Sequence, residues 1–194
     1  MDEMKQGIIK DTYEVVIKEI QTLITISYIL AVGIGLLFNY QKFSEFGINI
    51  FDYADVFDFL IAPFSDFKIV LFTLVSLAIT YSLIRLDLFW KRKFPKLYSK
   101  LSFVKGKKSW YNSYNYFSFA IVFIYYLYIS ADIYGNISKE QILNQSSIEI
   151  RFSDNEIKKG KMIGKTKDVI FLLIGEKVEA IPITSLVKEI EIIK

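Results

Sequence analysis

The residues of this chain that could do chemistry are carboxylates and tyrosines, because the 194-residue sequence contains no cysteine and no histidine. Without those two residue types, the usual zinc ligand sets and the Ser/His/Asp and Cys/His nucleophilic arrangements cannot be built. An enzyme would need carboxylates with a metal or a Ser/Lys pair, and no spacing in the sequence indicates either. We therefore expect a protein that is not an enzyme, with no catalytic residue, no metal site and no cofactor.

Three aspartates form the first candidate site. Asp52, Asp55 and Asp58 are spaced i, i+3 and i+6, which would place them on one face of a helix. A carboxylate face at a membrane surface could concentrate cations or form the mouth of a pore. The alternative is that these residues are only the wet face of an interfacial helix, since nothing in the sequence brings all three around one ion.

The second candidate is a polar track on the most aromatic apolar run of the chain. Tyr125, Tyr128 and Asp132 share one helical face. Because tyrosine hydroxyls in hydrocarbon need hydrogen-bond partners, we expect this face to look into a helix bundle or toward water. In the sharper hypothesis it meets the aspartate face and lines a pore. The alternative is an interfacial aromatic belt that ends in a helix-end carboxylate.

Membrane helices would position these candidates. Hydrophobic residues make up 53% of the sequence and cluster into charge-free runs, each close to the roughly 20 residues that a spanning helix needs. A short amphipathic helix is expected over residues 1–19. An interfacial amphipathic helix is predicted over about 48–62, ending at Pro63, because proline disfavours helical geometry in the residue before it. We predict three spans, over about 20–40, 67–88 and 111–132.

Small residues recur at every fourth position of the first predicted span. Ser27, Ala31 and Gly35 form this ladder, which would let another helix approach closely. One hypothesis is a face for self-association. The other is helix packing against the remaining spans of the same chain.

A basic linker between the second and third runs orients the chain. Short linkers with this bias stay on the cytoplasmic side, so we expect a multi-pass protein of the cell (inner) membrane with a cytoplasmic N-terminus and an external C-terminal domain. If the third run does not cross, that domain is cytoplasmic instead. We expect the linker to contact anionic membrane lipid, with a cytoplasmic protein partner as the alternative, and no nucleic acid. Its basic residues are Lys91, Arg92, Lys93, Lys96, Lys100, Lys105, Lys107 and Lys108.

The composition changes after residue 135, from membrane runs to short segments in which charges alternate with Ile, Val and Leu. A tight turn at Gly175 and a brief helical turn before the last strand separate these segments. The spacing and the stretch EAIPITSLVKEI resemble an SH3-like or Sm-like small barrel. We predict a membrane domain over 1–135 and a small all-β barrel over 136–194, with strands near 147–152, 158–165, 168–174, 178–183 and 187–193.

Together these features predict an α-helical membrane protein with three transmembrane helices, one interfacial helix and a small C-terminal β-barrel. The expected function is that of a non-enzymatic integral membrane protein that forms a homo-oligomer or binds a protein partner through its β domain. The alternative is a pore-forming or channel-like protein, such as a cation channel or a toxin-like or defence effector. A membrane immunity protein that binds a toxin is a related possibility.

Overall fold

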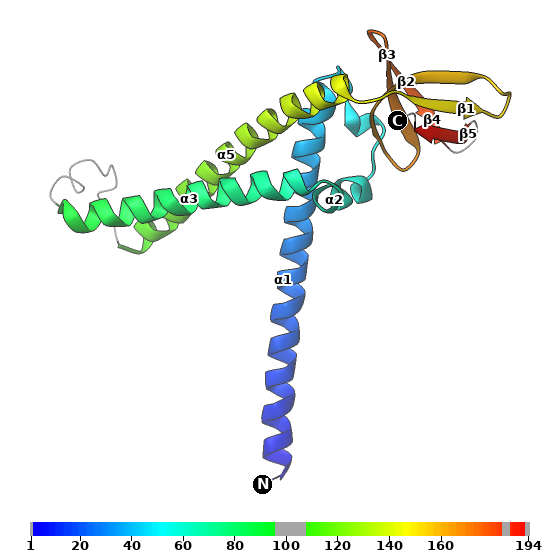
Figure 1. The fold of residues 1–194 in the computed structure, drawn as a ribbon. Helices are drawn as coiled ribbons and strands as arrows, with labels where there is room; N and C mark the ends of the chain where they lie inside the picture. The colour runs from blue at the N-terminus through cyan, green and yellow to red at the C-terminus, as the bar shows by residue number, and fades with distance from the viewer. Residues whose placement is uncertain (1, 96–107, 184–186, 193–194) are drawn as a thin grey trace.

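The computed structural model describes residues 2–95, 108–183 and 187–192, and it describes side chains over 17–95, 117–183 and 188–190. Within these described ranges, four helices are followed by a C-terminal antiparallel sheet of five strands (Figure 1). Three of the helices contain a stretch long and apolar enough to cross a membrane, as the sequence predicts. The helices are α1 (Asp2–Ser44), α2 (Val56–Ser65), α3 (Phe67–Lys93) and α5 (Lys108–Asn144), and a 3-10 turn, η1 (Ile50–Asp52), follows α1.

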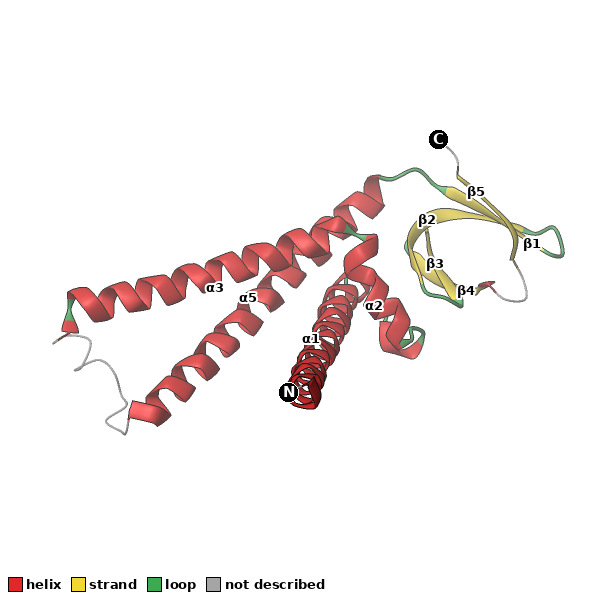
Figure 2. Cartoon of the chain, turned by 90° about the horizontal axis from the view of Figure 1, so that it is seen from below, coloured by secondary structure: helices red, strands yellow, loops and turns green. Residues whose placement is uncertain are grey.

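Helices α3 and α5 lie side by side, and α1 meets this pair near one end only (Figures 1 and 2). The meeting point is a small aromatic cluster, in which the fully buried Phe38 lies 5.3 Å from Tyr134 and 6.4 Å from Phe72 between ring centroids. Toward its N-terminus α1 points away from the pair, and every side chain from Lys18 to Leu30 is exposed. The three apolar helices therefore do not form one closed bundle within the chain.

Hydroxyl groups hold α3 against α5. The Oγ atoms of Ser76 and Ser130 lie 2.9 Å apart, and both residues are buried. Ser76 also lies 3.0 Å from the Phe72 carbonyl oxygen, and the Thr80 hydroxyl donates to the Ser76 carbonyl at 2.9 Å. These last two bonds lie within α3, whereas the Ser76–Ser130 contact joins the two helices. A hydroxyl contact between apolar helices in a membrane typically contributes about 0.6 kcal/mol, and the small side chains let the two backbones approach.

Helices α1 and α5 both continue beyond their predicted limits. α1 is one helix of 43 residues, so the expected separate helix over 1–19 is continuous with the first span. α5 runs to Asn144 and passes through Gly135, where the domain boundary was predicted. A Cβ on this glycine would lie 3.0 Å from the Gln41 carbonyl oxygen, so Gly135 allows α1 to pack closely against α5 instead of breaking the helix.

The helix predicted to lie at the membrane interface is shorter than expected and begins later in the chain. Residues 48–62 do not form one helix, because Asp55 has extended backbone angles and caps a helix that begins at Val56. The prediction that Pro63 ends the helix is also wrong, since α2 continues through it to Ser65. The proline lacks the amide hydrogen that would otherwise bond to the Phe59 carbonyl. That carbonyl faces α1, where a Cβ on Gly35 would lie 1.8 Å from its oxygen.

The sheet confirms the predicted strands to within one residue at each end. The strand order is β4-β3-β2-β1-β5, with all neighbours antiparallel. Ile148 pairs with Gly160 on one side and with Ile192 on the other. The helical turn expected before the last strand falls on residues 184–186, outside the described residues. The strands are β1 (Ile148–Phe152), β2 (Ile157–Lys165), β3 (Val169–Ile174), β4 (Lys177–Pro182) and β5 (Val187–Ile192).

The sheet curls but does not close, so the prediction of a barrel is wrong (Figure 2). β4 and β5 are its two edges. The concave side covers a core of its own that includes Ile150, Ile170 and Leu172. On the opposite side, Phe171 packs in a second core with residues of the helices. β3 is buried on both faces, which explains why its sequence, VIFLLI, is continuously apolar. The helices cover the outer face of β3, which would be exposed to solvent in an isolated closed barrel.

Candidate functional site

The sheet is docked on the helices by an aromatic contact. Phe171 is 1% exposed, and its ring centroid lies 5.3 Å from that of Phe43 on α1 and 5.2 Å from that of Tyr53. Both contacts are edge-to-face, an arrangement that stabilises aromatic pairs beyond their buried area. The ion pair between Lys139 and Glu45, at 3.2 Å, fixes the end of α5 against the end of α1 beside this contact.

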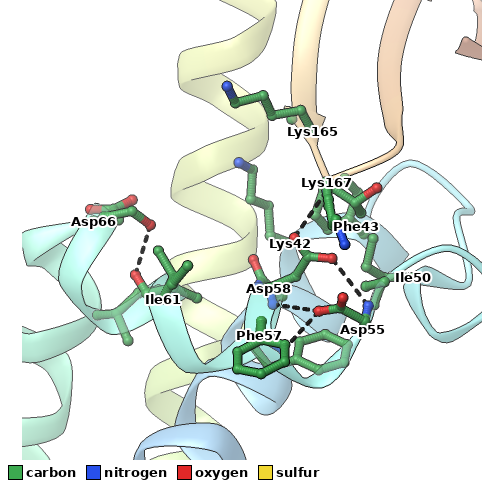
Figure 3. A pocket seen from close by; sticks show the side chains of 18 of the residues that line it. Lys42, Phe43, Ile50, Asp55, Phe57, Asp58, Ile61, Asp66, Lys165 and Lys167 are labelled. Carbon is green, nitrogen blue, oxygen red and sulfur yellow. Dashed lines mark hydrogen bonds between the residues drawn. The ribbon is translucent and has the colours of Figure 1, made fainter. Parts of the chain in front are cut away.

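A groove of about 780 Å³ lies where the helices meet the sheet, and we call it the junction groove (Figure 3). Its walls come from the end of α1, from α2, from the start of α3, from α5 and from the turn between β2 and β3. Its charged residues are Lys42, Asp55, Asp58, Asp66, Lys165 and Lys167, and its apolar residues include Phe57, Ile61 and Ile69.

Two of the carboxylates in the junction groove build the start of α2. Asp55 Oδ1 accepts hydrogen bonds from the amides of Phe57 at 2.7 Å and Asp58 at 3.1 Å. Asp58 Oδ2 accepts in return from the Asp55 amide at 3.1 Å, which completes a capping box. Asp58 Oδ1 accepts from the Lys167 amide at 3.0 Å and so ties α2 to the sheet (Figure 3).

The third carboxylate joins α3 to α5. Asp66 is the N-cap of α3 and accepts from the Lys68 amide at 2.9 Å through Oδ1. Its other oxygen, Oδ2, accepts from the Tyr134 hydroxyl at 2.9 Å. All three carboxylates of the groove therefore already accept hydrogen bonds that hold the fold together.

The lysines of the junction groove are not paired in this way. Lys42 is half-buried, and its Nζ lies 5.5 Å from the ring centroid of Phe43. Lys165, the last residue of β2, and Lys167, in the turn that follows, are both exposed. Figure 3 shows the amino groups of Lys42 and Lys165 extending in the same direction. Within the described part of the chain, none of these three ammonium groups has a carboxylate within ion-pair distance.

The junction groove provides ammonium, carboxylate and tyrosine hydroxyl groups beside apolar side chains. No family model, curated protein or solved structure matches this chain. Its function is therefore inferred from its own residues and their geometry.

The three aspartates of the first candidate site do not share a helical face. Asp52 ends η1 and is exposed, outside the lining of the junction groove. Asp55 and Asp58 line the groove and cap α2. The predicted i, i+3, i+6 alignment fails because the cap at Asp55 interrupts the helix between the first and second aspartate. Among the residues with described side chains, no three His, Cys, Asp or Glu residues are placed to hold a metal ion.

The polar track lies on the outer surface of α5. Tyr125 and Tyr128 are 61% and 52% exposed, and Asp132 is also exposed. The inward face of the helix instead carries buried Leu127, Ser130, Ala131 and Tyr134. Small residues at two of these positions allow α3 to approach, which bulky tyrosines would prevent.

The packing ladder is divided between two environments. Gly35 is buried against α2, which is not one of the predicted spans. Ser27 is exposed on the part of α1 that lies apart from the other helices, and Ala31 is half-buried.

In the basic linker, Lys91, Arg92 and Lys93 form the exposed last turn of α3, and Lys108 begins α5. The remaining linker residues, Lys96, Lys100, Lys105 and Lys107, lie outside the described residues.

Several residues of the junction groove were not predicted. Asp66 could have been recognised as an N-cap, because an aspartate directly before an apolar helical run is a helix-start signal. No local signal places Tyr134 beside it, since the two are 68 residues apart. The same holds for Lys165 and Lys167, which line one groove with Lys42 only because the sheet docks on the helices.

The capping role of Asp55 leads to a first prediction. Asp55→Ala should lower the free energy of unfolding by about 1 kcal/mol, because the amides of Phe57 and Asp58 lose their acceptor. Asp55→Asn should retain most of the stability, since asparagine is an equally good N-cap. Asp52→Ala serves as the matched control and should be neutral. Thermal unfolding in detergent, followed by circular dichroism, measures all three, and equal losses for Asp52→Ala and Asp55→Ala would contradict the assignment.

Proposed function

We propose that this protein is a non-enzymatic integral membrane protein that self-associates through α1 and presents its sheet to a protein partner at one membrane surface. The observation that carries the proposal is the exposure of every side chain from Lys18 to Leu30. This stretch belongs to one of the three apolar helices, yet it lies apart from the other two (Figure 1).

The surface of this part of α1 suits close contact with a second helix. Leu23 and Ile24 are 65% and 63% exposed, while Ser27 and Ala31 provide a narrow side on which another backbone can approach. The hydroxyls of Thr22 and Thr25 each donate to a carbonyl four residues earlier, at 2.9 Å. Those donors are satisfied within the helix and add no desolvation cost to an interface.

The docked sheet supports the partner-binding half of the proposal. Its contact through Phe171 and the hydrogen bond from the Lys167 amide to Asp58 hold it in a fixed position at the end of the helices. β5 is an edge strand, and an edge strand can pair with an added strand of another chain. With the basic linker on the cytoplasmic side, this sheet would stand at the opposite surface.

The absence of cysteine from the sequence allows a direct test of self-association. Single cysteines placed one at a time at residues 20–31 in otherwise unchanged protein, followed by mild oxidation in intact membranes, should give disulfide-linked dimers. The yield should peak at Ser27→Cys and recur at every third or fourth residue, because one face of a helix repeats with that period. A cysteine at Leu74, which is 54% exposed on α3, is the matched control and should give little dimer. A flat, low yield along α1 would contradict the proposal.

A pore is the second candidate, and the outward position of the polar track favours it. Tyr125, Tyr128 and Asp132 are exposed on an apolar helix, and polar residues of membrane helices usually face protein or water. In an assembly of several copies these faces could together surround an aqueous path. Reconstituted bilayers should then conduct, and Asp132→Asn should reduce cation conductance relative to Asp154→Asn in an exposed loop of the sheet. A silent bilayer would count against this candidate.

A further inference from the structure

We propose that the junction groove binds the phosphate group of a membrane phospholipid between the ammonium groups of Lys42 and Lys165. This site is separate from the α1 surface of the proposed function, so either can fail without the other. Its volume of about 780 Å³ lies within the range of roughly 300–1,000 Å³ that is typical of small-molecule sites.

The division of hydrogen bonds within the groove is the first argument. The oxygens of Asp58 and Asp66 each accept from a group on another element, and Asp55 caps its own helix. The ammonium groups of Lys42 and Lys165 have no such partner among the described residues. The N–H donors of these two ammonium groups are therefore available to an incoming anion, because none of the groove carboxylates accepts a hydrogen bond from them.

The burial of Lys42 is the second argument. Withdrawing an ammonium group from water is costly, and the ring of Phe43 and the charge of Asp66, which lies beyond ion-pair distance, compensate for only part of this cost. A Cβ on Gly164 would lie 3.4 Å from Lys42 Nζ, so this ammonium group lies against the end of β2, one residue before Lys165. The two lysines come from distant parts of the chain and line the same groove, so a single anion bound there could contact both.

The location of the groove indicates which anion this is. The groove lies at the ends of apolar helices long enough to cross a membrane, where lipid headgroups are found. Apolar side chains on α2 border it, and Phe57, Ile61 and Phe64 are 65%, 57% and 78% exposed at i, i+4 and i+7. This apolar stripe could contact the acyl chains of a phospholipid, while the two ammonium groups beside it contact the phosphate.

Native mass spectrometry of the full chain in detergent tests the site, with dioleoylphosphatidylglycerol as the probe. The unaltered protein should retain one tightly bound lipid, and the double variant K42Q/K165Q should bind it at least about tenfold more weakly. K42R/K165R should retain binding, because arginine also donates to phosphate. K177Q/K188Q removes two exposed lysines of the sheet outside the groove and should bind lipid as the unaltered protein does.

Two further arms distinguish the source of the phosphate. Dioleoylglycerol has the same acyl chains without phosphate and should not displace the bound lipid, and millimolar inorganic phosphate should displace it only weakly. Displacement by dioleoylglycerol would mean a purely apolar groove, and full displacement by inorganic phosphate would mean a site for a soluble anion. Either result, or equal retention by K42Q/K165Q, would overturn the proposal. Should that variant not fold, K165Q alone changes an exposed lysine of the site and should weaken retention severalfold relative to K177Q.

Discussion

Gly35→Ala is expected to lower the free energy of unfolding by about 3 kcal/mol, the upper end of the usual cost of overpacking. The reason is that an added Cβ would lie 1.8 Å from the Phe59 carbonyl oxygen and 3.2 Å from Pro63 Cδ. Both atoms belong to the rigid backbone or ring of α2, so neither can move aside without displacing the helix. Thermal unfolding of the purified protein in detergent measures the effect.

Gly33→Ala is the matched control for this prediction. It lies on the same helix two residues earlier, and a Cβ there would have no atom within 4 Å. Alanine is a better helix former than glycine, so this variant should raise stability by about 0.5–1 kcal/mol. The two alanine substitutions should therefore act in opposite directions. Equal effects would show that α1 does not pack against α2 at Gly35.

Phe171→Ala should release the sheet from the helices and cost about 3–5 kcal/mol, as is typical of a buried phenylalanine. The ring of Phe171 contacts those of both Phe43 and Tyr53, and Phe171 is 1% exposed. Limited proteolysis in detergent should then cut the connection between α5 and β1, over residues 145–147, at least severalfold faster than in the unaltered protein.

Two comparisons separate release of the sheet from its unfolding. Phe43→Ala removes the helix side of the same contact and should also accelerate cleavage, while the core formed by Ile150, Ile170 and Leu172 stays intact. Phe64→Ala removes the same side chain at a position that is 78% exposed and should leave cleavage unchanged. If Phe43→Ala does not accelerate cleavage, the aromatic contact does not dock the sheet.

The helices and strands were predictable because their signals are local. A charge-free run of about 20 residues is a membrane-helix signal, and it located the apolar stretches of α1, α3 and α5. Short runs rich in Ile, Val and Leu, several of them alternating with charges, located the strands. The turn between β3 and β4 followed from Gly175, whose φ of 61° favours glycine. Each of these signals lies within the segment that it describes.

The junction groove was not predictable because its contacts join distant segments. Lys167 reaches Asp58 across 109 residues, and neither residue carries a mark of the other in the sequence. Asp55 was assigned to a helical face by spacing alone, although its capping geometry excludes it from the helix. Closure of the sheet was wrongly expected because strand spacing says nothing about whether helices cover the outer face of β3.

The unbroken course of α1 has a mechanical consequence. At about 1.5 Å per residue, a helix of 43 residues extends about 65 Å, roughly twice the hydrocarbon thickness of a bilayer. Its final turns include Phe38, which contacts Tyr134 on α5, and Phe43, which contacts Phe171 on the sheet. Since the helix is continuous, a tilt imposed at its N-terminal end would be transmitted as leverage to its other end, where it would shift α5 and the sheet.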